Sequence, residues 1–597
     1  MPARPRTIRP YAIRPYAVRP YVIRAAAVAA STALALSPAT AAPASATAPA
    51  ALPGTASGTA YGASGTGLAA TPSPTPAPSG SATRSPAIAR PAPAGTATPG
   101  TATPGAATPG SPAPAALATP TPAPTAPQPL RLTPEQRKLI DSVDVRRVHE
   151  HLQAFQRIAD AHGGNRAAGS PGYLASRDYV ADRLRRAGYQ VTVQPFEFGY
   201  FKERSAVLEQ VAPRRVRYTH SPQPQAAPKE GEPTGDFATM VYSGSGDVTA
   251  PVHPVDVTLP PAKQPSSTSG CQRSDFAGFP RGAIALIQRG TCEFAVKAKN
   301  AQDAGAAAVI IFNEGQPDRS DLERGSLKEP GITIPVVSTS HKVGAALAQS
   351  KATVHLKTDT ISETRTTHNV IAESRWGDPG KVVMVGAHLD SVEEGPGIND
   401  NASGSAAVLA VAEALAQTKT RNRLRFAWWG AEELGLVGST HYVETLLDAD
   451  RRRIALYLNF DMIASPNGAI KIYEGTKSKA GELPPGSAEI ERLFQSYFAA
   501  RRQPYGRADL NDRSDYASFR KAGIPTGGIF TGAGESKTAE EAKLFGGTAG
   551  RPYDPCYHRS CDTLTNINHQ ILPVTTAAIA TATVVYAFAP NPPEADM

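Results

Sequence analysis

Five side chains of the types that bind metal ions follow one another through the last third of the sequence. They are His388 in VVMVGAHLDS, Asp400 in GIND, Glu433 in FAWWGAEE, Asp461 in LYLNFDM and His558 in CYHRSCD. Each lies at the end of an apolar, strand-like run or in a loop bounded by glycine or cysteine. Two imidazoles and three carboxylates suit a pair of zinc ions that share one bridging carboxylate. The set therefore predicts metal-assisted hydrolysis.

Three further residues could take part in the same chemistry. Glu432 directly precedes Glu433, and a carboxylate that does not bind metal can take a proton from water and give it to a leaving amine. Asp390 lies two residues after His388, where a carboxylate can fix the orientation of a metal-bound imidazole. Arg513 in NDRSDYASF could bind a backbone group of a substrate.

Each of these residues also has an ordinary interpretation when it is taken alone. His388 could be a histidine at a strand end, Asp400 a helix cap, and Arg513 a solvated surface arginine. Adjacent glutamates are mostly solvated pairs. The ordered set of five, and the position of Glu432 after the apolar run LRFAWW, favour the active-site interpretation.

Four cysteines form two local couples, Cys271 with Cys292 and Cys556 with Cys561. In an exported protein an even number in this arrangement predicts two disulfides, whereas free buried thiols are the alternative. The second couple encloses Tyr557 and His558. A disulfide there would hold both residues, and the tyrosine hydroxyl could donate to a developing oxyanion, although a purely structural role for the disulfide is the alternative.

Strand-like and helical segments alternate from about residue 368 onward. Strands are expected at VVMVGAH, LRFAWWG, IALYLNFDM and IPTGGIF, with helices at SGSAAVLAVAEALAQ and SAEIERLFQSYFAARR between them. This alternation predicts an α/β fold of three layers, in which helices cover both faces of a mostly parallel mixed sheet. Catalytic groups in such folds collect beyond the carboxyl ends of the strands, so His388, Glu433 and Asp461 are expected to lie together.

The folded part is expected to begin near residue 133. Apolar residues at helical spacing predict a helix over 145–158, and Ser170-Pro171 is typical of the start of a second helix that ends at Gly188. The run QVTVQPFEF alternates like a strand. Residues 202–360 contain the strand-like runs FATMVYS, GAIALIQ and AAVIIFN and the helical run CEFAVKAKNAQDAG. This segment lacks clustered His, Asp and Glu in its sequence, and is expected to form a separate α+β module.

The N-terminal quarter of the chain has the composition of an export signal and a linker. Residues 1–42 combine six arginines with a short apolar run and small residues, which predicts a secretory signal for the general export route; a membrane anchor is the alternative. Residues 43–132 consist mainly of Ala, Thr, Pro, Gly and Ser, and such a composition is typical of an extended linker. The apolar C-terminal segment around 575–589 is rich in small residues and favours a packed helix over a membrane span.

The positive charge of the chain is concentrated in this N-terminal part. The whole sequence carries a net charge of +9, but eight of its 61 basic residues precede Pro129, and the remaining 53 basic residues face 52 acidic ones. The sequence pI of about 9.2 is therefore no argument for nucleic-acid binding. We expect neither a nucleic-acid partner nor stable membrane insertion once the signal is removed, and we expect a monomer.

Six motifs resemble, in order, those of the secreted bacterial double-zinc aminopeptidases of leucyl type. They are HLDS, NDNASG, WWGAEE, NFDM, RSDYASF and CYHRSCD. The similarity covers roughly residues 133–589, and relatives of this family include glutamate carboxypeptidases and the transferrin-receptor ectodomain. Residues 202–360 resemble the protease-associated (PA) domain that many members insert. The resemblance implies a peptidase domain in two pieces, 133–201 and 361–590.

The resemblance also implies a metal-binding role for each of the five residues. His388 and Asp461 would bind one zinc ion, Glu433 and His558 the other, and Asp400 would bridge them. Some close relatives are activated by calcium, so the sequence leaves calcium open as a further cofactor, although no calcium site is evident in it.

The same resemblance implies roles in catalysis and in substrate binding. Glu432 would be the general base, Tyr557 would stabilise the tetrahedral intermediate, and Arg513 would contact the substrate. The substrates would be the N-termini of peptides or proteins, because acidic groups near the metals hold a free α-amine in this family. Relatives often prefer large apolar N-terminal residues such as leucine.

Three other functions compete with this one. A carboxypeptidase, or a cyclase acting on N-terminal glutamine, could use the same scaffold, but cyclase relatives keep a single working zinc ion and do not need the full set. A non-catalytic binding protein that recruits partners through the PA module would have no reason to keep Glu432, Tyr557 and all five ligands.

Overall fold

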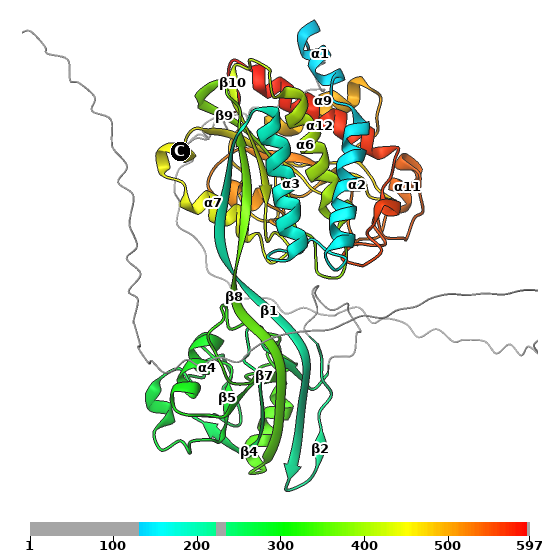
Figure 1. Ribbon diagram of the computed structural model, residues 1–597. Coiled ribbons are helices and arrows are strands. Elements are labelled where there is room, and N and C mark those ends of the chain that lie inside the picture. The colour runs from blue at the N-terminus through cyan, green and yellow to red at the C-terminus, as the bar shows by residue number, and fades with distance from the viewer. Residues whose placement is uncertain (1–129, 223–234, 594–597) are drawn as a thin grey trace, which may run out of the picture. The chain divides into compact units, whose positions relative to one another are not determined.

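The computed structural model describes residues 130–222 and 235–593. The expected export signal (1–42) and nearly all of the expected linker (43–132) lie outside the described residues. The described residues form a large α/β domain and a smaller inserted domain between two segments of it (Figure 1).

The sheet of the large domain has the strand order β13-β12-β14-β11-β9-β10-β8-β1. These strands are β1 (Gln190–Ala212), β8 (Thr353–Glu373), β9 (Asp378–His388), β10 (Asn422–Trp429), β11 (Ile454–Phe460), β12 (Lys471–Tyr473), β13 (Gly506–Ala508) and β14 (Thr526–Phe530). The central strands β14, β11, β9 and β10 are parallel to one another. Strand β12 runs antiparallel to β14 and parallel to β13, β8 runs antiparallel to β10, and β1 runs antiparallel to β8. The predicted mostly parallel mixed sheet is therefore confirmed.

Helices cover both faces of this sheet. On one face lie α2 (Val145–Ala161), α3 (Pro171–Ala187), α6 (Gly404–Leu415), α9 (Ser487–Ala500) and α12 (Ile571–Phe588), with α1 (Pro134–Asp141) against α12. On the other face lie α7 (Val437–Thr445) and α10 (Tyr516–Lys521). Trp428 and Trp429 are fully buried in the cores on opposite faces of the sheet. Strand β10 is a continuous apolar run in the sequence because both of its faces are buried.

Short elements complete the large domain. They are the π-helical segment η2 (Ile398–Ser403), the helices α8 (Asp448–Arg451) and α11 (Ala539–Phe545), and the 3-10 turn η3 (Leu564–Asn566).

The predicted positions of α2 and α3 are confirmed, and a capping contact marks the predicted start of α3. The hydroxyl of Ser170 accepts the backbone N–H of Tyr173 at the start of α3, and Gly188 ends this helix with φ +99°. Helix α2 ends just before Gly163, which also has positive φ. A helix often ends with a residue in the left-handed conformation, and glycine adopts this conformation at the lowest free-energy cost. Both helices therefore end where the sequence provides a glycine.

A long two-stranded ribbon joins the two domains. Strands β1 and β8 pair antiparallel from Gln190 opposite Glu373 to Ala212 opposite Thr353 (Figure 1). The part of β8 near Glu373 also pairs with β10 of the large domain, and the part near Thr353 pairs with the inserted domain. Residues before and after the insertion thus belong to the same sheet, which makes the large domain discontinuous in sequence.

The inserted domain continues from β8 through strands in the order β4-β5-β6-β7-β3. Its elements are β2 (Val216–Arg217), β3 (Phe237–Thr239), β4 (Gly246–Val255), η1 (Arg273–Phe276), β5 (Ile284–Gln288), α4 (Phe294–Asp303), β6 (Ala308–Phe312), β7 (Val336–Thr339) and α5 (His341–Gln349). The run FATMVYS forms only the three residues of β3, because the chain then turns, with Ser243 donating to the carbonyl of Met240 and Tyr242 at φ +68°.

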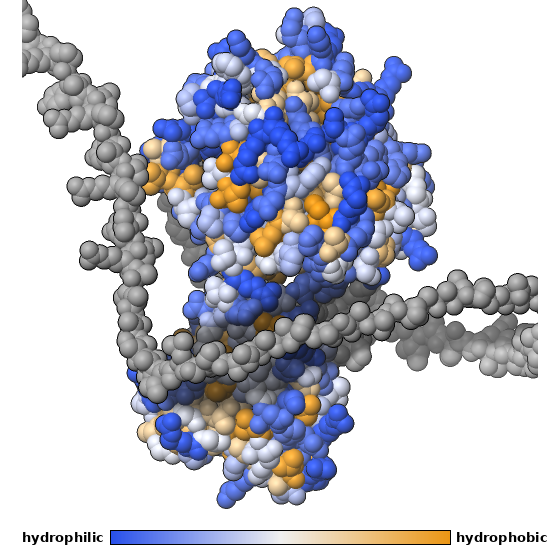
Figure 2. Space-filling view, viewed as in Figure 1, coloured by the Kyte–Doolittle hydropathy of each residue, from blue (hydrophilic) through white to orange (hydrophobic). Residues whose placement is uncertain are grey.

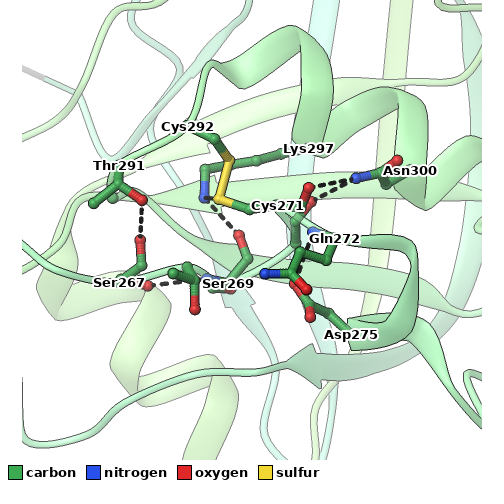
Figure 3. Close-up of a disulfide and its surroundings, with 12 residues drawn as sticks. Ser267, Ser269, Cys271, Gln272, Asp275, Thr291, Cys292, Lys297 and Asn300 are labelled. Atoms are coloured by element: carbon green, nitrogen blue, oxygen red, sulfur yellow. Dashed lines mark hydrogen bonds between the residues drawn. A yellow bond between two sulfur atoms is a disulfide. The ribbon is translucent and has the colours of Figure 1, made fainter.

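Both predicted disulfides are present. Cys271 and Cys292 join the loop before η1 to the loop before α4 (Figure 3). Beside this disulfide the buried ammonium group of Lys297 donates to the carbonyls of Ser269, at 2.5 Å, and Gln288, at 3.0 Å. Burial lowers the pKa of Lys297 to about 8. The disulfide and the lysine together fix a loop that has little regular secondary structure.

Helix α12 is the described helix that is long and apolar enough to cross a membrane, and 67% of it is buried within the protein. Its residues pack into the core between the sheet and α9. On the face of the molecule drawn in Figure 2, hydrophilic residues cover much of the described surface and apolar residues gather in small patches.

Candidate active site and metal centre

The residues with metal-binding side chains meet at one edge of the large sheet. His388 is the last residue of β9, Asp461 follows the last residue of β11, and Glu432 and Glu433 lie three and four residues beyond the end of β10. Because β10, β9 and β11 are parallel neighbours, their carboxyl ends lie side by side. The predicted meeting of these side chains at the strand ends agrees with the structure.

Asp400 lies between the two histidines and directs one carboxylate oxygen toward each. Its Oδ1 lies 3.3 Å from Nε2 of His388, and its Oδ2 lies 3.3 Å from Nε2 of His558. Asp461 Oδ1 lies 3.3 Å from the first histidine, and Glu433 Oε2 lies 3.0 Å from the second. The arrangement is two histidine–carboxylate pairs with one carboxylate shared between them.

Several of these atoms have no hydrogen-bond partner in the described residues although they are buried. They are Oε1 of Glu433, Oδ1 of Asp461 and Nε2 of His558. A buried polar atom without a partner carries a large free-energy cost unless another group satisfies it. The ligand atoms of His388, Glu432 and Asp461 lie close enough together to hold a metal ion, and so do those of His388, Asp400 and Glu433. Imidazoles and carboxylates grouped in this way fit divalent metal ions.

The electrostatics of the site also favour the binding of metal ions. Burial raises the pKa of Glu432 well above its usual range and raises that of Glu433 to about 7. Burial works in the same direction on Asp400, but the two histidines that its oxygens face outweigh it and lower the pKa of this carboxyl group. Four carboxylates crowded around two imidazoles repel one another, and cations would relieve that repulsion.

Asp390 holds the turn that carries the two glutamates. Its carboxylate accepts the backbone N–H groups of Glu432 and Glu433, at 3.2 and 3.3 Å. Nδ1 of His388 lies closer to the backbone oxygen of Asp390, at 3.1 Å, than to its carboxylate, at 3.6 Å. The role expected from sequence, orienting the histidine through the carboxylate, is thus shared with the backbone of the same residue.

Asp562 holds the backbone at the shared carboxylate. Its two oxygens accept the backbone N–H groups of Asn399, at 2.9 Å, and Asp400, at 3.0 Å, and its Oδ1 also accepts the side-chain amide of Asn566. Sequence reasoning missed Asp562. The signal that could have found it is its position directly after Cys561, in the same loop as His558.

Arg166 is a second residue that sequence reasoning missed. Its guanidinium group is fully buried and donates to the carbonyls of Leu389, Pro396, at 2.9 Å, and Gly397, at 2.7 Å. Burial lowers the pKa of Arg166 to about 10. The residue comes from the loop between α2 and α3, so the segment before the insertion braces the loop that joins His388 to Asp400.

Asp461 is oriented by a chain of hydrogen bonds. The hydroxyl of Ser514 donates to its Oδ2 at 2.7 Å, and the amide of Asn459 donates to that hydroxyl at 2.9 Å. This leaves Oδ1 of Asp461 facing His388. Ser514 belongs to the motif RSDYASF. From the sequence, only Arg513 of this motif was expected to contribute to the site.

Three residues of the site have a left-handed backbone although none is glycine. They are Ala431, Met462 and His558, with φ of +57°, +48° and +56°. Each is a metal-binding candidate or the direct neighbour of Glu432 or Asp461. Such conformations are costly for residues with a Cβ atom and cluster at functional sites.

The second disulfide encloses the end of the site. Cys556 and Cys561 are bonded across five residues, with 5.3 Å between their Cα atoms. Inside this loop the ring of Tyr557 stacks on that of His558, with 3.9 Å between ring centres. Burial raises the pKa of Tyr557, so its hydroxyl keeps its proton.

A cavity of about 490 Å³ opens over these residues. Its walls include Glu432, Asp461 and Tyr557, and also the aromatic residues Tyr473, Tyr516 and Phe530. Arg513 also lines it, but its side chain is 66% exposed and lies 3.7 Å from a carboxylate oxygen of Glu535. The arginine is therefore at the rim of the cavity, where its side chain is exposed.

Comparisons with known proteins place the chain in a family. Residues 369–583 match the model of peptidase family M28, and residues 248–347 match that of the PA domain. The chain is 50% identical to an aminopeptidase of Pseudomonas aeruginosa over 443 residues, which cover 73% of this chain and 80% of that protein. It is 40% identical to the probable lipoprotein aminopeptidase LpqL of Mycobacterium tuberculosis, over 73% of this chain and 84% of that protein.

Further matches agree in family and in fold. The chain is 39% identical to the probable leucine aminopeptidase 2 of Aspergillus fumigatus, over 71% of this chain and 79% of that protein. The solved structure of an aminopeptidase from Aneurinibacillus sp. strain AM-1 matches with a TM-score of 0.51 and 26% identity, covering 77% of this chain and 98% of that chain. The chain therefore belongs to peptidase family M28, as an aminopeptidase of that family with an inserted PA domain.

Proposed function

We propose that this protein is an exported aminopeptidase that uses two zinc ions to remove the N-terminal residue of peptides, with a preference for large apolar residues. The observation that carries the proposal is the position of Asp400, whose two oxygens each lie 3.3 Å from a different histidine. A carboxylate that faces two separate imidazole–carboxylate pairs suits a bridging ligand.

The two zinc ions would share this carboxylate. His388 and Asp461 would hold one ion and Glu433 and His558 the other, in keeping with the short distances within each pair. Zinc supplies Lewis-acid chemistry, which polarises a carbonyl group and acidifies water. The buried, unpartnered atoms of Glu433, Asp461 and His558 support this assignment, because metal binding would satisfy them.

Glu432 would act as the general base. Its side chain is 10% exposed and lies beside the ligands, with its Oε2 4.0 Å from Nε2 of His388, and it lines the cavity. Its raised pKa suits a group that accepts a proton from the attacking water and passes it to the leaving amine. Asp390 supports this role, because its carboxylate accepts the backbone N–H of Glu432 and so fixes the position of this residue.

Tyr557 and Arg513 would contact the substrate. The hydroxyl of Tyr557 stays protonated and lines the same cavity as Glu432, so it can donate to the oxyanion that develops on the scissile carbonyl. Arg513 at the rim can bind a backbone carbonyl. The excess of carboxylates would attract the free α-amine of a peptide N-terminus.

The preference for large apolar residues rests on the cavity wall. Tyr473, Tyr516 and Phe530 form an aromatic cluster there, with 4.9 Å between the rings of the two tyrosines and 6.3 Å between those of Tyr473 and Phe530. Lys471, a basic residue of the wall, is bound by Glu541 at 3.0 Å. Aromatic residues in the wall of a cavity favour the binding of apolar side chains.

Export is supported by the two disulfides. Disulfides persist in oxidising compartments outside the cytosol, and all four cysteines of the chain are paired. The composition of residues 1–42 and the lipoprotein among the relatives agree with an exported protein.

The test is a panel of aminoacyl amides, offered with a free amine and N-acetylated, with and without a metal chelator. We expect leucinamide and phenylalaninamide to be hydrolysed faster than glycinamide. Acetylation should abolish hydrolysis, and chelation should abolish it until zinc is restored. Hydrolysis of the acetylated amides, or full activity in chelator, would contradict the proposal.

A further inference from the structure

A second cavity, of about 650 Å³, lies beside the metal-binding residues. Glu433 and His558 line both cavities, so the two cavities meet at these residues. Glu432, Tyr557 and Arg513 line the first cavity, whereas the walls of the second come from the loop after β9, the loop after β10, the ribbon strand β1 and the inserted domain.

One wall of this second cavity is apolar. Leu434 directly follows Glu433, and its side chain is 47% exposed, which makes it one of five large hydrophobic side chains left exposed in the described residues. Phe201 of β1 and Tyr242 of the inserted domain line the same cavity, and their rings contact edge to face, with 6.0 Å between centres. Leu434, Phe201 and Tyr242 are named here the apolar wall.

Hydrogen bonds hold both the backbone and the side chain of Tyr242 in place. Its backbone has φ +68°, a conformation that is strained for an aromatic residue, and the hydroxyl of Ser362 donates to its carbonyl at 3.2 Å. Its phenol hydroxyl donates to the carbonyl of Gly199 at 3.1 Å. A Cβ atom on Gly199 would lie within 2.7 Å of that phenol oxygen, so glycine at this position of β1 lets the ring pack there.

Two acidic residues at this cavity are held by neighbouring side chains. Glu393, which also lines the cavity, accepts hydrogen bonds from Tyr200 and Lys202, each at 2.5 Å. Its carboxylate is thus held by neighbours on β1 and is neutralised by one of them. Glu203 of the same strand lies 2.8 Å from His220.

We propose that the apolar wall is the binding site for the second residue of the substrate, the one that follows the scissile bond, and that it selects peptides with an apolar or aromatic residue at that position. This inference rests on the proposed function. If the first cavity holds the N-terminal residue beside Glu432, the second cavity, which meets the first at Glu433 and His558, can take the residue that follows the scissile bond. The inserted domain then takes part in substrate selection through Tyr242.

The test compares leucine release from three substrates that share the same N-terminal residue. Leucinamide has no second residue, Leu-Gly-amide has one without a side chain, and Leu-Phe-amide has an aromatic one. We expect the wild-type protein to show a kcat/KM about tenfold higher for Leu-Phe-amide than for Leu-Gly-amide, which is the range that burial of an apolar side chain provides.

Three variants locate this preference. Leu434→Ser and Tyr242→Ala are each expected to reduce the ratio of the two kcat/KM values severalfold while leucinamide is hydrolysed as by wild type. Tyr242→Phe, which keeps the ring and loses only the hydroxyl, should retain the ratio. Leu447→Ala, at another exposed leucine, is the matched control and should change nothing.

The outcomes separate this inference from the proposed function. If leucinamide is hydrolysed normally but wild type does not discriminate between the two dipeptide amides, or if Leu434→Ser keeps the full ratio, the inference is wrong and the proposed function stands. If wild type hydrolyses none of the three substrates, the proposed function itself fails. Leu434→Ser changes an exposed loop residue, so it provides an answer even if Tyr242→Ala does not fold.

Discussion

The carboxylate of Asp390 accepts the backbone N–H of Glu432, with 3.2 Å between Oδ1 and the nitrogen. This bond, with the parallel one to Glu433, links the loop after β9 to the loop after β10. His388 lies only two residues from Asp390 in the chain. The carboxylate of Asp390 therefore fixes the position of the proposed general base relative to His388.

The first prediction concerns Glu432. Glu432→Gln keeps the shape and burial of the side chain but removes its ability to accept a proton. We expect kcat to fall by a factor of about 10² to 10⁴ while two zinc ions per chain remain bound. Zinc content by elemental analysis and steady-state kinetics on leucinamide would check this; near-normal turnover would rule out the general-base role.

The second prediction separates the shared ligand from the unshared ones. Asp400→Ala removes a carboxylate that faces both histidines and should lose both zinc ions, whereas Asp461→Ala should lose one. The measurement is zinc per chain after dialysis. Glu535→Ala, at an exposed carboxylate of the same cavity, is the control and should keep both. Equal zinc loss in the first two variants would argue against a bridging role.

The third prediction concerns the brace formed by Arg166. Arg166→Met would leave the buried carbonyls of Leu389, Pro396 and Gly397 without their donor. We expect the free energy of unfolding to fall by about 3 kcal/mol or more, and zinc affinity to fall with it, because these carbonyls belong to the loop between His388 and Asp400. Thermal unfolding with and without zinc tests this, with Arg166→Lys expected to recover part of the loss.

The fourth prediction is a pH dependence that does not involve the metal site. Glu413 near the end of α6 binds Arg183 of α3 at 2.6 Å and faces His151 of α2 at 3.4 Å, with 16% of its side chain exposed. Burial alone would raise the pKa of Glu413, but these partners outweigh it and lower the value from 4.5 to about 2.

The sign follows from proton binding. The folded state binds fewer protons than the unfolded state between these values, so the stabilisation is complete above about pH 4.5 and is lost as the pH falls toward 2. We expect Glu413→Gln to be less stable than wild type by about 3 kcal/mol at pH 7, with the difference shrinking below pH 4.5. Urea unfolding across this range is the measurement. Glu444→Gln, at an exposed carboxylate, is the control; a difference that does not change with pH would refute the assignment.

The fifth prediction contrasts the two disulfides. Replacing Cys556 and Cys561 with alanine would release the loop that holds Tyr557 and His558, and we expect activity to fall about tenfold or more. The matched variant, with Cys271 and Cys292 replaced, alters only the inserted domain and should keep the hydrolysis of leucinamide. Equal losses of activity in both variants would show that the second disulfide has no special link to the site.

The sequence by itself predicted the class of fold and the residues that meet at the site. Apolar runs such as LRFAWW are local patterns that reflect burial on both faces, and parallel strands place their carboxyl ends at one edge, so the order of elements was enough to bring His388, Glu433 and Asp461 together. The helix boundaries at Ser170 and Gly188 followed from local capping chemistry in the same way.

Only the tertiary structure decided what supports those residues. Arg166 and Asp562 bind backbone groups more than 150 positions away in the chain. The position of Asp562 beside Cys561 places it near the site, but no local pattern identifies the distant carbonyl and N–H groups that these two side chains bind. The apolar wall likewise joins Phe201, Tyr242 and Leu434, which come from three separate segments. Sequence determined the chemical groups of this protein because their types and order are local properties, whereas the contacts that orient them depend on how distant segments pack.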